Sequence, residues 1–212
     1  GLAVDRRRDD LIYVGDQENN RLQVFMPDGT FVRTWGDALF VHIHDVGIDP
    51  TTGDIFVGDL ESNILRRFTA TGEELWRTGN TGPREGEFDG LWGMSTDSEG
   101  NIYIAESANR RVQVFDRDGL FLRTWNGYEG TRFTKPTGVF VDNVDVVYVC
   151  DSLAMEILLF DTSGAELDRW GLSELVDFAT EPEDIVLDAT RTNIYIAEVR
   201  QHRVLHLVQD AR

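Results

Sequence analysis

The chain has 212 residues and a formal net charge of −18, with 38 acidic and 20 basic side chains. Nucleic acids and anionic membrane surfaces are bound mainly through Lys and Arg, so this charge balance argues against both as partners. A hydrophobic content of 41%, with 12 Phe, 5 Tyr and 5 Trp, is ample for a core and excludes a wholly disordered chain, and no apolar run approaches the roughly 20 residues of a membrane span.

The first predicted element is a short apolar segment that ends in Asp and recurs along the whole chain. Its copies are residues 2–5, 46–49, 94–97, 139–142 and 185–188. The final Asp residues recur every 44 to 48 positions, and Asp after a strand is typical of a turn. A steady period of this length predicts a repeat architecture.

Three further strand-like elements follow each copy of the first. The second is apolar, carries an aromatic residue at its second place and ends in a carboxylate, at residues 12–16, 55–59, 102–106, 147–151 and 194–198. The third covers residues 21–25, 64–68, 111–115, 156–160 and 203–207. A turn with Gly leads to the fourth at residues 29–36, 72–79, 119–126 and 164–171, and the fifth repeat stops before it.

Four short strands per period predict an all-β fold, a β-propeller of four-stranded antiparallel blades. We expect a single domain over residues 1–212, with blades at about 1–44, 45–92, 93–137, 138–183 and 184–212. Five repeats leave two alternatives open. The blades form a closed five-bladed ring, which we favour because an open ring exposes apolar blade faces, or they are part of a six-bladed ring. Trp35, Trp125 and Trp170, with Trp76 nearby, recur on fourth strands and are expected to pack between blades.

The residue pattern of these repeats resembles that of the NHL repeat. Residues 1–5, 12–16, 20–25 and 31–36 match it strand by strand, and so does the third repeat through residues 109–115. The second, fourth and fifth repeats are looser, and the fourth has Met155 and Glu156 where the family has Asn and Arg. The resemblance covers essentially the whole chain and implies a propeller, but this family serves many roles.

In such propellers ligands bind at the mouth of the central channel, where the inner strands begin. The resemblance therefore implies that the residues just before the inner strands form a ligand site, and these are His44, Trp92, Thr137 and Glu183, with Asp45 beside His44. Trp92 is the best candidate for stacking on a ligand, although it could also simply fill the channel top.

The segment around His44 and Asp45 also resembles one repeat of the peptide-amidating lyases. Those propellers hold zinc through three His and a calcium ion nearby, but Trp92, Thr137 and Glu183 stand where two further His would be needed. A catalytic zinc needs three protein ligands. This sequence offers His44 and Glu183, and His42 only if it lies on the same rim, which is a weak basis for a metal site. The recurring acids Asp16, Asp59, Glu106, Asp151 and Glu198 suit calcium or, as we prefer, hydrogen bonds within each turn.

No complete catalytic constellation is visible in the sequence. It has no Gly-x-Ser-x-Gly elbow, and Cys150 lies in an apolar strand that predicts a buried, inert thiol. We expect a non-catalytic binding or scaffold propeller that presents its channel mouth and top loops to a protein, peptide or small ligand, basic or cationic in character. The alternatives are a metal-dependent lyase or hydrolase, and a purely structural part of a larger assembly. The chain starts with Gly1 and shows no targeting segment, so cytoplasmic and extracytoplasmic locations both stay open.

Overall fold

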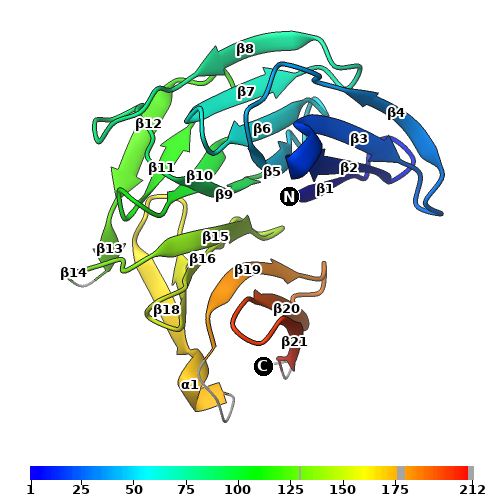
Figure 1. Ribbon diagram of the computed structural model, residues 1–212. Helices are drawn as coiled ribbons and strands as arrows, with labels where there is room; N and C mark the ends of the chain where they lie inside the picture. Colours follow the sequence, from blue (N-terminus) through cyan, green and yellow to red (C-terminus); the bar gives the residue numbers. More distant parts are fainter. Residues whose placement is uncertain (129, 176–179, 210–212) are drawn as a thin grey trace.

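The computed structural model describes residues 1–128, 130–175 and 180–209, and the architecture is all-β. Figure 1 shows antiparallel sheets set as blades around a common axis. No helix in this described part is long and apolar enough to cross a membrane. The blades are β1 (Leu2–Asp5), β2 (Leu11–Asp16), β3 (Arg21–Phe25) and β4 (Phe31–Trp35); β5 (Ile43–Ile48), β6 (Ile55–Asp59), β7 (Ile64–Phe68) and β8 (Glu74–Thr78); β9 (Leu91–Thr96), β10 (Ile102–Glu106), β11 (Arg111–Phe115) and β12 (Phe121–Trp125); β15 (Pro136–Val141), β16 (Val147–Asp151), β17 (Glu156–Phe160) and β18 (Glu166–Gly171); and β19 (Pro182–Leu187), β20 (Asn193–Glu198) and β21 (Arg203–Val208).

Each blade pairs its strands in chain order, from an inner strand at the axis to an outer strand at the rim. Short elements fill the connections: a 3-10 turn, η1 (Gln17–Asn19), a hairpin of β13 (Gly127–Tyr128) and β14 (Thr131–Arg132) between the third and fourth blades, and α1 (Leu172–Leu175) before the fifth. The predicted fold class and the missing fourth strand of the last blade are therefore confirmed in the described residues.

Strand β10 shows how one strand contributes to two cores. Tyr103 belongs to a buried cluster with Phe160 of the fourth blade, whereas Ile104, its neighbour along the strand, belongs to a cluster with Phe56 of the second blade. Successive side chains of a strand point to opposite faces, so a blade with apolar residues at every position packs against the blade before it and the blade after it.

The tryptophans of the fourth strands pack between blades, as predicted. Trp35 lies against the turn glycine Gly72 of the second blade, and Trp125 lies against Gly164 of the fourth. Trp125 also contacts Phe160, with ring centroids 5.6 Å apart. A large flat ring thus covers a turn that has no side chain, which suits the sheet-to-sheet interface.

The first and last blades do not close a five-bladed ring. Tyr195 has in β20 the place that Tyr13 has in β2, but Tyr195 is 40% exposed and Tyr13 is fully buried. On the first blade Leu2 is 60% exposed, and Figure 1 shows β1 and β19 at the two ends of an open arc. The closed five-bladed alternative, which the sequence favoured, is thus not the arrangement observed. The outer faces of the first and last blades do not pack on each other, and no other described sheet covers them.

Candidate functional site

The four inner strands that follow the first blade each begin with an irregular pairing. In β5 the register passes from Ile43 opposite Asp59 to Asp45 opposite Gly58, so His44 is an extra residue with no partner across the strand. Trp92 in β9 and Glu183 in β19 are skipped in the same way. A bulge redirects the side chain of its extra residue. Three of the residues that the sequence assigned to the channel mouth are therefore bulge residues: His44, Trp92 and Glu183.

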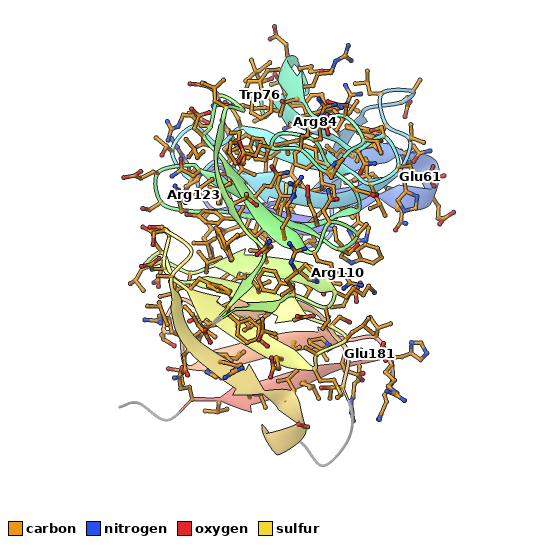
Figure 2. The ribbon with its side chains drawn as sticks, turned by 90° about the vertical axis from the view of Figure 1, so that its left-hand side faces the viewer. Glu61, Trp76, Arg84, Arg110, Arg123 and Glu181 are labelled. Atoms are coloured by element: carbon orange, nitrogen blue, oxygen red, sulfur yellow. The ribbon has the colours of Figure 1, made fainter. Side chains whose placement is uncertain are left out.

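These bulges explain why each inner strand begins two residues before the expected blade boundary. The strands start at Ile43, Leu91, Pro136 and Pro182, because pairing resumes for one residue beyond each bulge. The loops on this side of the molecule form one face of the propeller, where Figure 2 labels Glu61, Arg84, Arg110 and Glu181.

A small cavity of about 140 Å³ lies at the mouth, with His44, Asp45, Trp92, Glu183 and Asp184 in its wall. Gly1, Gly93 and Gly138 complete the lining. A larger cavity of about 600 Å³ follows the channel, and Asp45 and Asp184 line it as well. The two carboxylates therefore stand between the mouth and the channel.

His44 is held against Trp92 of the next blade. Its Nδ1 lies 2.7 Å from the Trp92 carbonyl oxygen, and the two rings are 4.6 Å apart between centroids. A carbonyl only accepts, so Nδ1 carries the proton and donates. Burial lowers the pKa of His44, which keeps the ring neutral near pH 7 and leaves Nε2 as an acceptor.

Lys135, which the sequence reasoning missed, lies beside this site and contacts Trp92, although it does not line the cavity itself. Its ammonium lies 4.9 Å from the centroid of the Trp92 ring, within the range of a cation–π contact. Burial raises the pKa of Glu183, while the Lys135 ammonium and the Trp92 indole lower it, so the carboxylate lies near both groups. The sequence offered one signal: Lys135 is the single lysine of the chain and directly precedes β15.

Asp45 and Asp184 are an acidic pair with perturbed titration. Burial raises the pKa of Asp45 to about 6, against the charge of the Gly1 ammonium and the hydrogen bonds that the backbone N–H groups of Met94 and Val46 donate to it. Burial and the charge of Asp45 raise the pKa of Asp184 to about 7. The Asp184 residue is nevertheless exposed to solvent, which reaches it through the channel.

The substitution Asp184→Asn should stabilise the protein at alkaline pH. A carboxyl with a raised pKa favours the folded state most below its unfolded pKa near 4, and that stability falls as the pH rises toward about 7. Asn keeps an oxygen for the Ile185 N–H and does not ionise. After discounting for solvent screening we expect about 1 kcal/mol, or 2–4 °C in Tm, at pH 8 and little change at pH 4.

Asp188→Asn is the matched control for that experiment. Asn193 and neighbouring backbone N–H groups hydrogen-bond Asp188 and lower its pKa to about 2. The stability that Asp188 contributes is present above its unfolded pKa and is lost as the pH falls toward its folded pKa. The substitution should therefore destabilise the protein at pH 8. Thermal melts at both pH values that moved the two variants in the same direction would contradict the assignment.

Thr137 does not reach the open mouth. It is buried, and its hydroxyl donates to the Pro182 carbonyl 3.1 Å away, so it joins the fourth and fifth blades. Gly138, its neighbour, lines the cavity instead. Among the expected mouth residues, the structure brings together His44, Asp45, Trp92 and Glu183.

The metal expectation finds no support in the residues that the structure describes. They contain no group of three or more His, Cys, Asp or Glu side chains that could hold a metal ion. His42, the third ligand considered, lies away from the mouth, with its Nε2 against the Gln17 side chain and its Nδ1 3.6 Å from Glu61.

The acids that end the second strands have the structural role preferred from the sequence. Asp59 accepts hydrogen bonds from the backbone N–H groups of Val41 and His42, 2.8 and 3.1 Å away. Asn19 and Arg21 donate to Asp16 within the following turn. Glu106, Asp151 and Glu198 are likewise hydrogen-bonded to neighbouring turns or loops. Cys150 is buried, as expected, and burial raises the pKa of its thiol.

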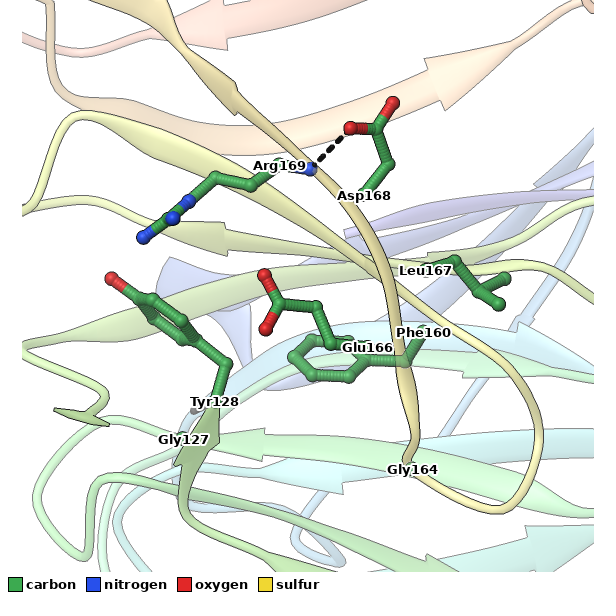
Figure 3. A pocket seen from close by; sticks show the side chains of 8 residues that line it. All are labelled: Gly127, Tyr128, Phe160, Gly164, Glu166, Leu167, Asp168 and Arg169. Atoms are coloured by element: carbon green, nitrogen blue, oxygen red, sulfur yellow. Dashed lines mark hydrogen bonds between the residues drawn. The ribbon is translucent and has the colours of Figure 1, made fainter. Parts of the chain in front are cut away.

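A third cavity lies at the blade rim, away from the channel mouth. Figure 3 shows it between the β13–β14 hairpin and β18, lined by Tyr128, Phe160, Glu166 and Arg169. Its volume is about 600 Å³. Arg169 lies over the Tyr128 ring at 5.0 Å, and the Tyr128 hydroxyl donates to Glu156. Arg169, the one cation among the described lining residues, is thus already placed on the partly buried Tyr128 ring.

Five blades of antiparallel strands around a channel define the class of the protein, a β-propeller. The family model for the NHL repeat matches residues 88–115, which run from the loop before β9 through β11. This match places an NHL repeat in the third blade of the propeller.

Curated relatives carry the same repeat. The chain is 32% identical over 100 residues to NHL repeat-containing protein 3 of Homo sapiens, which covers 42% of this chain and 28% of the relative. The mouse protein of that name is 26% identical over 160 residues, covering 70% and 44%. Protein brain tumor of Drosophila melanogaster is 26% identical over 123 residues, covering 57% and 12%. The matches thus span less than half the length of these relatives.

Solved structures share the fold. A streptogramin B lyase superposes with a TM-score of 0.70 at 12% identity, covering 100% of this chain and 68% of that one. A virginiamycin B lyase from Staphylococcus aureus, solved with quinupristin, superposes with a TM-score of 0.71 at 13% identity, covering 100% and 70%. Identities this low establish a common architecture and no common chemistry.

Proposed function

We propose that this protein is a non-catalytic binding propeller whose ligand site is the channel mouth. The observation that carries the proposal is that three bulges, on three different blades, direct His44, Trp92 and Glu183 to one small cavity. A concave site with an aromatic wall and a few convergent polar groups is the usual form of a ligand pocket. The ligand is a protein, peptide or small molecule, and the charge of −18 favours basic or cationic ones.

An NMR titration tests the site without knowledge of the ligand. A panel of cationic, neutral and anionic small molecules and short peptides is titrated into ¹⁵N-labelled protein, and the five indole signals are followed. We expect ligands that shift the Trp92 indole signal, identified by its loss in Trp92→Leu, and that bind this variant more weakly. Ligands that bind the variant and the parent protein equally would place the site elsewhere.

A structural role in a larger assembly is a second candidate, favoured by the exposed blade faces. Val204 is 65% exposed and Val208 is 63% exposed, and both lie beside Tyr195 on one face of the fifth blade. In the blades that have a neighbour on that side, the next sheet covers the equivalent face. Exposed apolar sheet faces of this kind associate. We expect a second copy to cover this face at high concentration, and Val204→Asp to weaken that association at least tenfold in analytical ultracentrifugation. A monomer at every concentration would contradict this role.

A further inference from the structure

We propose that the channel mouth binds a primary alkylammonium group, and that Lys135 occupies the place of this group when the site holds no ligand. The inference rests on the proposed function and names the ligand class of the same site. It follows from three features of the mouth: the position of the Lys135 ammonium, the excess of hydrogen-bond acceptors, and the size of the cavity.

Lys135 already shows how an ammonium sits in the site. Its Nζ lies over the Trp92 ring at 4.9 Å, and its charge lowers the pKa of the nearby Glu183 carboxyl. The main chain of Lys135 is fixed, because Asp151 accepts from its N–H and its carbonyl accepts from Ser152. The flexible side chain is therefore tethered at its base while its charged end rests on an aromatic face, from which a ligand can displace it.

The remaining groups of the mouth suit a donor-rich cation. His44 Nε2 is an acceptor because Nδ1 donates to the Trp92 carbonyl, and Glu183, Asp45 and Asp184 add carboxylate oxygens. An ammonium on a primary amine has three N–H donors to offer these groups, whereas a quaternary ammonium has none. The acceptors therefore favour a primary ammonium over a methylated one.

The cavity sets the size of the group that enters. Its volume of about 140 Å³ is several times the roughly 10–15 Å³ that one water molecule needs. An ammonium with a short alkyl chain, such as the end of a lysine side chain or a small aliphatic amine, fills such a space. The larger channel cavity beyond Asp45 and Asp184 is lined by apolar side chains such as Val46, Met94 and Phe140 together with polar ones such as Ser95 and Asp142.

Removal of Lys135 provides the test. NMR titrations compare n-butylammonium, its neutral isostere n-butanol, and tetramethylammonium on the parent protein and on Lys135→Met. We expect Lys135→Met to bind n-butylammonium at least tenfold more tightly. In the parent protein the Lys135 side chain leaves only a fraction of the sites open, and the apparent affinity is reduced in proportion to that fraction. n-Butanol and tetramethylammonium should bind at least tenfold more weakly than n-butylammonium to the variant.

Second substitutions in the Lys135→Met protein separate the contributions of individual groups. Trp92→Leu should weaken n-butylammonium binding about 3- to 30-fold, as expected for loss of a cation–π contact. A capped tripeptide with a central lysine distinguishes the source of the ammonium: equal binding indicates a free amine, and tighter binding a peptide. Melting curves confirm that each variant is folded before it is titrated.

Arg169→Met is the matched control. It removes a cation from above an aromatic ring, and one positive charge from the protein, at the rim cavity of Figure 3. It should leave n-butylammonium binding unchanged. An equal gain from Arg169→Met and Lys135→Met, or no gain from Lys135→Met, would overturn the alkylammonium assignment. A panel ligand without an ammonium group that still shifts the Trp92 signal would overturn it too, while leaving the binding function intact.

Discussion

Replacement of Arg111 by Met is expected to destabilise the protein by about 3–5 kcal/mol, because it leaves a buried carboxylate without its partner. Glu106 is fully inaccessible to solvent, and Arg111 pairs with it at 2.5 Å. Burial raises the pKa of Glu106, and the hydrogen bonds and charge of Arg111 oppose that rise. The same guanidinium donates to the carbonyl oxygens of Pro83, Arg84 and Glu87, so its loss also releases the loop between the second and third blades.

The measurement is a thermal or urea melt, and the expected loss corresponds to about 6–20 °C in Tm. Arg21→Met is the matched control, since Arg21 pairs with Asp16 at the same place of the first repeat but both side chains are partly exposed. That substitution should cost about 1 kcal/mol or less. Similar losses from the two variants would show that burial of the acid is not what makes Arg111 important.

The substitution Gly138→Ala should destabilise by about 1–3 kcal/mol and should also disturb the mouth. A Cβ at Gly138 would lie 2.7 Å from the Asp184 Cα and from the Glu183 carbonyl oxygen, both in the backbone of β19. Backbone cannot rotate away as a side chain can, so β15 and β19 would have to separate. The cost comes from close approach of two inner strands.

Gly47→Ala on β5 is the control for this effect. A Cβ there would meet the flexible Met94 side chain at 3.4 Å and the Phe56 Cβ at 3.8 Å, both ordinary contacts. The substitution should therefore be neutral or slightly stabilising, because Ala has less conformational freedom than Gly in the unfolded chain. Urea unfolding measures both variants. NMR titration of each should show weaker ligand binding at the mouth for Gly138→Ala only, and equal behaviour of the two variants would contradict the close-approach argument.

The candidate site could be located from the sequence only as a set of equivalent repeat positions. His44, Trp92 and Glu183 were found because each precedes an inner strand at the same point of the repeat. The sequence did not indicate that these positions are bulges, nor that Thr137 turns inward to bond Pro182. Lys135 was missed because its ammonium reaches Trp92 from the neighbouring blade, a contact between residues 43 positions apart in the sequence.

The sequence by itself determined the all-β class, the four-strand repeat and the structural role of the recurring acids and tryptophans. Those features depend on local chemistry: alternating side chains, turn-forming Asp and Gly, and carboxylates that accept hydrogen bonds from nearby turns. Only the tertiary structure decided how the blades close and which mouth residues meet. Tyr195 has the same local pattern as Tyr13, and it is exposed only because no further sheet packs on it. Such contacts depend on the angles between blades, and a repeat pattern within one blade carries no information about them.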